Sequence, residues 1–77
     1  MNWNLEGLIV RGRYLGQHPV QGHVVLSRTK YGSGIDHHVV LDHPLDLFGS
    51  CRDRVVLEDH HVDQVLQNHS KEWVRHG

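Results

Sequence analysis

Residues 20–42 have the pattern of one long β-hairpin, and this stretch constrains the fold more than any other. The first arm, residues 20–27, is VQGHVVLS, and the second arm, residues 37–42, is HHVVLD. The segment between them, KYGSG at residues 30–34, contains the glycines that allow a chain to reverse. Both arms are rich in β-branched and other apolar residues, which favour an extended backbone. The sequence therefore predicts two antiparallel strands at the centre of the fold.

The apolar residues of the two arms determine the expected register. Side chains alternate between the two faces of a strand, and a slip of one residue moves every side chain to the other face. A register that turns all four apolar residues toward the core pairs Val24 with Leu41 and Leu26 with Val39. On the opposite face, the same register aligns His23 with Asp42, Val25 with Val40, and Ser27 with His38.

These last six residues, here called the outer hairpin face, form the predicted oligomer or partner surface. Val25 and Val40 make up its apolar centre, and polar residues flank them. Two interpretations stay open, because single exposed valines are ordinary on a protein surface. The interpretation as an interface is favoured by size, since a chain of 77 residues buries a thin core and gains stability by associating with other copies.

Residues 8–15 predict a strand that precedes the hairpin. Arg11 and Arg13 alternate toward solvent, and the residues that face the core are Leu8, Val10, Gly12 and Tyr14. A turn that contains Pro19 connects this strand to the hairpin.

The segment after the hairpin predicts a long connection over residues 43–53 and a strand over residues 54–58. The apolar residues expected to cap one end of the core from this connection are Leu45, Leu47 and Phe48. The next residues allow two structures. Asp59 is a suitable N-cap for a helix that reaches Trp73, or residues 59–63 form one 3₁₀ turn before a short strand over residues 64–67. We favour the turn and strand, followed by a polar tail over residues 68–77 with a short helix as its alternative.

The order of these elements resembles an SH3-like small β-barrel, as found in KOW modules and in the plasmid-borne type II dihydrofolate reductase. The resemblance covers residues 8–67 and implies one all-β domain of about five antiparallel strands. In that reductase, a Val-Gln-Ile-Tyr segment from each of four subunits lines a central pore. Here the matching residues 55–58 have Val56 and Glu58 in place of the Gln and Tyr. We therefore transfer no site residue, and the resemblance implies only that the chain acts as a homo-oligomer.

Nine histidines are the unusual feature of the composition. Histidine is a common metal ligand, but adjacent His37 and His38 point to opposite faces of a strand and cannot hold one ion. His60 and His61 lie in a turn near Asp59 and Asp63, and two imidazoles alone make a weak site. We therefore expect no metal site and no cofactor.

No catalytic constellation can be identified from the spacing of the residues. Cys51 lies next to Arg52, which would lower the pKa of a thiol, but the sequence fixes no histidine beside it. The carboxylates are scattered over expected loops and strand ends. The sequence therefore favours a protein that is not an enzyme, with a site formed only at an oligomer interface as a third hypothesis.

The alternative function is nucleic-acid binding, because small barrels commonly use a strand face and its loops for this purpose. Basic side chains would neutralise phosphates, and an aromatic ring would stack on a base. The candidate residues are Arg11, Arg13, Arg28, Lys30 and Tyr31. A formal net charge of −1 gives no general attraction to nucleic acid.

The leading hypothesis is a small, non-enzymatic binding module that forms a homo-oligomer and binds a protein or small-molecule partner. No membrane partner is expected, because no apolar run approaches the roughly 20 residues of a membrane span. The N-terminal residues lack the pattern of a signal peptide, and a single unpaired cysteine is typical of a reducing compartment. The sequence thus predicts a cytoplasmic protein.

Overall fold

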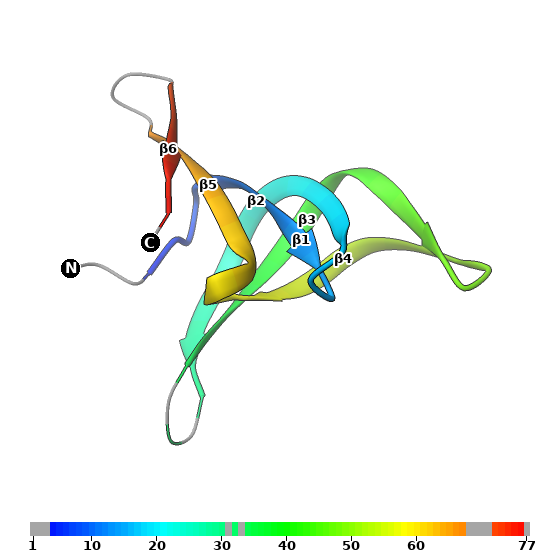
Figure 1. Cartoon of the computed structure of the whole chain (residues 1–77), viewed down its shortest axis with the longest axis horizontal. Coiled ribbons are helices and arrows are strands. Elements are labelled where there is room, and N and C mark those ends of the chain that lie inside the picture. The colour runs from blue at the N-terminus through cyan, green and yellow to red at the C-terminus, as the bar shows by residue number, and fades with distance from the viewer. Residues whose placement is uncertain (1–3, 31, 33, 68–71, 77) are drawn as a thin grey trace.

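The chain folds into one antiparallel β-sheet in a computed structural model that describes residues 4–30, 32, 34–67 and 72–76 (Figure 1). Its elements are β1 (Ile9–Tyr14), β2 (His18–Thr29), β3 (Ile35–Leu47), β4 (Ser50–Glu58), the 3₁₀ helix η1 (Asp59–His61), β5 (Val62–Gln67) and β6 (Glu72–Arg75). The strand order is β4-β3-β2-β1-β5-β6. The prediction of an all-β domain is confirmed.

The sheet curls but does not close into a barrel, because β4 and β6 remain its two edges. Curling brings β1 across to β4 and η1, where a Cβ atom at Gly12 would lie 3.2 Å from Cδ1 of Leu57 and would collide with the carbonyl oxygen of His61. Gly22 allows a similarly close approach of β2 to β3, since a Cβ atom there would collide with the carbonyl oxygen of Val40. Both glycines are therefore needed where two backbones meet.

The core lies on the concave face of this curled sheet. The predicted inward residues of β1 are confirmed, because Val10 and Gly12 are buried while Arg11 and Arg13 are exposed. Leu5, from the segment before β1, is buried as well. The core cluster is made of Leu5, Val10, Val24, Val39, Leu41, Val55, Leu57, Val62 and Val65.

The predicted register of the central hairpin is wrong. Val24 pairs with Val39 rather than Leu41, a shift of two residues that keeps both side chains on the core face. Leu26 pairs with His38, so Val25 has no partner on β3 and forms a β-bulge. A bulge places two residues opposite one and shifts the alternation of all that follow. Leu26, predicted to be inside, is therefore 42% exposed, and Ser27, predicted to be outside, is 5% exposed.

Strands β3 and β4 form a second long hairpin where a connection over residues 43–53 is expected. Leu47 pairs with Ser50 around a two-residue turn, and this arm projects from the rest of the sheet (Figure 1). Leu47 is buried and Leu45 packs against the core, as predicted. Phe48 does not cap the core, because it lies at the tip of the arm and is 86% exposed.

The C-terminal segment follows the turn-and-strand alternative. Residues 59–61 form η1, and β5 begins directly after it at Val62 and pairs with β1. The expected polar tail contributes a sixth strand instead of a helix, because Glu72–Arg75 pair with β5. After β6, the backbone N–H of His76 donates to the carbonyl oxygen of Asp63 at 3.1 Å.

Candidate functional site

The convex side of the β2–β3 hairpin carries most of the predicted outer hairpin face. His23, Val25 and Asp42 are exposed, and His38 and Val40 are half-buried. Ser27 is absent from this face, because the bulge turns its side chain inward. Leu26 takes its place opposite His38, so the face is more apolar than the sequence predicts.

A hollow of about 510 Å³ adjoins this face at the side where β1 ends, and the buried residues Val39 and Val55 form part of its lining. Four of its lining side chains are apolar and largely exposed: Leu15 at 54%, Val25 at 48%, Val56 at 44% and Leu26 at 42%. His38 pairs with both Leu26 and Val56, so these three residues form a row across β2, β3 and β4. Arg52 and Arg54 of β4 line the hollow as well. We call this depression the outer hollow, and its exposed or half-buried lining residues are Leu15, Val25, Leu26, His38, Arg52, Arg54 and Val56.

Two exposed apolar residues have a strained backbone. Leu15 has φ of 56° and Phe48 has φ of 52°, and they are the two non-glycine residues with positive φ in the described part of the chain. Bulky side chains are rare in this region, and one costs on the order of 1 kcal/mol or more. Each precedes a glycine in a tight turn, Gly16 and Gly49. Asn or Gly would relieve the strain in either turn, so neither local conformation nor core packing favours these apolar residues.

A series of hydrogen-bonded polar groups extends along the core side of the sheet from the bulge to η1. The backbone N–H of Leu5 donates to Oγ of Ser27 at 3.1 Å, and this Oγ lies 2.7 Å from Nδ1 of His37. On the other side of the ring, Nε2 of His37 lies 2.7 Å from Oδ1 of Asp59. Nε2 of His76 lies 2.8 Å from the same oxygen. We call Ser27, His37, Asp59 and His76 the buried polar chain.

The ionised state of Asp59 determines which atoms donate the hydrogen bonds of the buried polar chain. Burial raises the pKa of Asp59, but hydrogen bonds from His37 and His76 outweigh it and hold the pKa below its ordinary value. An ionised carboxylate only accepts hydrogen bonds, so both Nε2 atoms carry a proton. When His37 is neutral, its Nδ1 therefore accepts the hydroxyl proton of Ser27. Each buried group then has a partner, which is what buried polar groups require.

The order Ser-His-Asp matches that of a hydrolase triad, but the arrangement does not suit nucleophilic catalysis. The side chain of His37 is fully buried and Ser27 is 5% exposed, so no substrate reaches the hydroxyl. Oγ of Ser27 also faces Nδ1, whereas a serine nucleophile normally gives its proton to Nε2. The buried polar chain is therefore suited to holding β2, β3 and η1 together.

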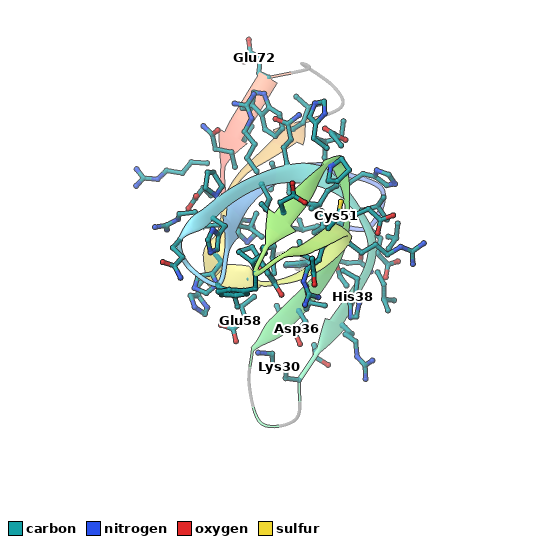
Figure 2. The ribbon with its side chains drawn as sticks, turned by 90° about the vertical axis from the view of Figure 1, so that its right-hand side faces the viewer. Lys30, Asp36, His38, Cys51, Glu58 and Glu72 are labelled. Atoms are coloured by element: carbon teal, nitrogen blue, oxygen red, sulfur yellow. The ribbon has the colours of Figure 1, made fainter. Side chains whose placement is uncertain are left out.

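A second polar cluster lies on the exposed side of η1. Nε2 of His60 lies 3.2 Å from Oε2 of Glu58, and the rings of His60 and His61 are 4.1 Å apart. Nζ of Lys30 contacts Glu58 at 2.9 Å and Asp36 at 3.1 Å, at the lower end of the molecule in Figure 2. The hydrogen bond from Lys30 lowers the pKa of Glu58, and the hydrogen bond to Glu58 raises that of Lys30.

Among the described candidate nucleic-acid residues, Arg11 and Arg13 lie apart from Arg28 and Lys30. Arg11 stacks over the ring of Trp73 and donates to Gln21, and Arg13 forms an ion pair with Asp63. Both arginines line a second, more open hollow of about 710 Å³. Arg28 and Lys30 lie at the far end of β2, where Lys30 is paired with two carboxylates. Tyr31 lies outside the described residues.

Cys51, the other reactive residue that the sequence points to, is exposed on β4, where it pairs with Asp46. The structure thus shows an accessible thiol with a carboxylate residue as its cross-strand neighbour.

Sequence reasoning missed the residues that depend on the bulge and on long-range contacts. Leu26 was assigned to the wrong face, and Leu15 and Val56 reach the outer hollow only because the sheet curls. The meeting of His37 with Asp59 and His76 joins residues that are 17 to 39 positions apart. The positive φ at Leu15 and Phe48 has one visible signal, which is the glycine that follows each of them.

Comparison of this chain with protein-family models, with curated proteins and with solved structures finds no match. In the described part of the chain, no helix has the length and apolar character needed to cross a membrane.

Proposed function

We propose that the protein is a non-enzymatic binding module that associates with a second copy of itself through the outer hollow. The observation that carries this proposal is the convergence of Leu15, Val25, Leu26 and Val56, all more than 40% exposed, around one hollow. Exposed apolar groups that gather around a depression mark interaction sites, whereas scattered ones are ordinary.

The strained backbone at Leu15 supports the same conclusion. A leucine with positive φ at a turn lowers the stability of the monomer, and its exposed side chain regains little by packing. Residues in strained conformations gather at functional sites. Contact with a partner would remove the apolar side chain of Leu15 from water, and this burial would stabilise the complex.

The projecting β3–β4 arm supports a second copy as the partner. Phe48 is a strained, exposed aromatic residue at the tip of the arm, and a hollow of about 510 Å³ has room for its ring. Asp46 on the same arm carries a negative charge, which is complementary to the positive charges of Arg52 and Arg54 at the outer hollow. Reciprocal insertion by two copies would form a closed dimer with two-fold symmetry.

Sedimentation velocity tests the proposal with one variant and one matched control. Leu26→Asp places a charge in the outer hollow, and Val74→Asp places the same charge at an exposed valine of β6. We expect the wild type and Val74→Asp to associate at micromolar concentration and Leu26→Asp to stay monomeric. A wild type that stays monomeric throughout this range would contradict the proposal.

The nucleic-acid alternative has weaker support, because Arg11, Arg13 and Lys30 are engaged with groups of the same chain. A mobility shift with mixed RNA and DNA that weakens steeply with salt would favour it. A cytoplasmic location is part of the proposal too, because Cys51 is an exposed free thiol that a reducing compartment would keep unpaired.

A further inference from the structure

Three side chains of the buried polar chain bring metal-ligating atoms to one point. They are His37 from β3, Asp59 from η1 and His76 from the segment after β6, and their ligand atoms all lie within 4.8 Å of one another. Two imidazole nitrogens and one carboxylate oxygen are a donor set that zinc and similar divalent transition metals bind. We propose that His37, Asp59 and His76 bind one divalent transition-metal ion of the zinc class.

The geometry needs only a small adjustment to accept the ion. Both Nε2 atoms approach Oδ1 of Asp59, at 2.7 Å for His37 and 2.8 Å for His76. Ligand atoms about 2.0–2.1 Å from a tetrahedral zinc ion are separated by roughly 3.3 Å. Binding therefore widens each contact by about half an ångström. The two imidazole rings are nearly perpendicular, at 88°, so they approach the point from different directions.

The surroundings of His37 fix the orientation of its ring. Oγ of Ser27 lies 2.7 Å from Nδ1, on the side of the ring away from Asp59. Metal-ligating histidines commonly donate their second N–H to a neighbouring oxygen, which sets the ring and the tautomer. With Nε2 bound to the ion, the proton of the neutral ring lies on Nδ1 and is donated to Oγ of Ser27. Metal binding thus reverses the hydrogen bond that joins Ser27 and His37.

Exposure at the site leaves one side open to water. The side chain of His37 is fully buried, whereas those of His76 and Asp59 are 17% and 36% exposed. An ion held there would have protein ligands on the inner side and a position for water on the outer side. Three protein ligands with one open position is an arrangement that zinc adopts in proteins.

The neighbouring cluster of Glu58, His60 and His61 also gathers three ligand atoms, but its charge is less suitable. The ammonium group of Lys30 lies 2.9 Å from Glu58 and already neutralises that carboxylate. A cation would have to compete with Lys30 there, whereas Asp59 forms its hydrogen bonds with His37 and His76, which become neutral ligands. The two clusters therefore serve as site and control.

Isothermal titration calorimetry of the tag-free protein with Zn²⁺ tests the proposal. We expect one ion per chain, an at least tenfold loss of affinity in His76→Gln, and no comparable loss in His60→Gln. His76 is chosen because His37 and Asp59 keep their mutual hydrogen bond in its absence. Binding that His76→Gln leaves unchanged, or that His60→Gln abolishes, would overturn the proposal.

Nitrogen NMR of the imidazole rings gives a second readout on the wild type, which needs no variant to fold. We expect Zn²⁺ to move the His37 proton from Nε2 to Nδ1 and to shift both His37 and His76. Saturating Zn²⁺ that leaves the tautomer and shifts of these two rings unchanged would contradict the proposed site, whatever the ion binds elsewhere.

Discussion

Oγ of Ser27 lies 2.7 Å from Nδ1 of His37 on the core side of the sheet. Regular alternation along β2 would place Ser27 on the outer side. The bulge at Val25 accounts for this relationship, because it reverses the orientation of the residues that follow. The same shift moves Leu26 outward into the outer hollow. One irregularity in β2 therefore places Ser27 in the buried polar chain and Leu26 in the outer hollow.

Removing the hydroxyl of Ser27 is expected to destabilise the fold. Ser27→Ala leaves the buried Nδ1 of His37 and the N–H of Leu5 without their partner, and an unsatisfied buried group costs about 1–3 kcal/mol. Urea denaturation measures the loss. Ser50→Ala, at an exposed serine of β4, is the control and is expected to change stability by less than about 0.5 kcal/mol. Equal effects of the two changes would argue against the buried polar chain as a structural element.

Truncating Leu26 distinguishes the observed register from the one that the sequence predicts. Leu26 is 42% exposed, so Leu26→Ala is expected to cost about 1 kcal/mol or less in dilute monomeric protein. Leu57→Ala, at a residue that is 1% exposed, is expected to cost about 2–5 kcal/mol. Denaturation curves of the two variants make the comparison. Similar losses would mean that Leu26 belongs to the core and that β2 has no bulge there.

Replacing Phe48 is expected to affect the monomer and the oligomer in opposite directions. Asn tolerates positive φ and suits a turn with glycine at its second position, so Phe48→Asn should stabilise the monomer by about 1 kcal/mol. The same change removes the aromatic ring that we propose inserts into a second copy. Thermal denaturation of dilute protein and sedimentation of concentrated protein measure the two effects. A variant that associates as strongly as the wild type would exclude Phe48 from the interface.

The ion pairs of Lys30 predict a dependence on pH at the alkaline end. Hydrogen bonds to Glu58 and Asp36 raise the pKa of Lys30 above its ordinary value of 10.5. A group whose pKa is raised by folding contributes stability that is complete below its unfolded pKa and is lost as the pH rises through the folded pKa. The difference in melting temperature between the wild type and Lys30→Met should therefore be present at neutral pH and shrink above pH 10.5.

Lys30 is an exposed group, so the size of this difference should be small and should decrease with salt. Arg75→Met removes an exposed cation from β6 and serves as a control. A difference for Lys30→Met that stays constant through the alkaline range would show that the ion pairs do not contribute to stability.

The sequence predicts the strands well because their signals are local. Alternating apolar residues at Val10, Val24 and Val39 identify the core, and Asp59 with the two histidines after it identifies the turn before β5. The candidate surface was partly predictable for the same reason, since Val25 and His38 lie on the expected outer side.

What the sequence could not predict depends on backbone geometry and on contacts between distant residues. No side-chain pattern marks Val25 as the unpaired residue of a bulge, because every residue from Val24 to Leu26 is apolar and fits either face. The curl of the sheet that brings Leu15 toward Val56 is likewise a property of the whole fold. His76 lay in a segment expected to be a polar tail, so its contact with Asp59 could not be anticipated.

The most direct test of the proposed function is a series of amide ¹H–¹⁵N correlation spectra of the wild-type protein from micromolar to millimolar concentration. Association through the outer hollow predicts shifts concentrated at Leu15, Val25, Leu26 and Val56, with Phe48 at the tip of the arm shifting together with them. Unchanged spectra in a protein that also sediments as a monomer over this range, or shifts confined to the Arg11 and Arg13 side of the sheet, would contradict it.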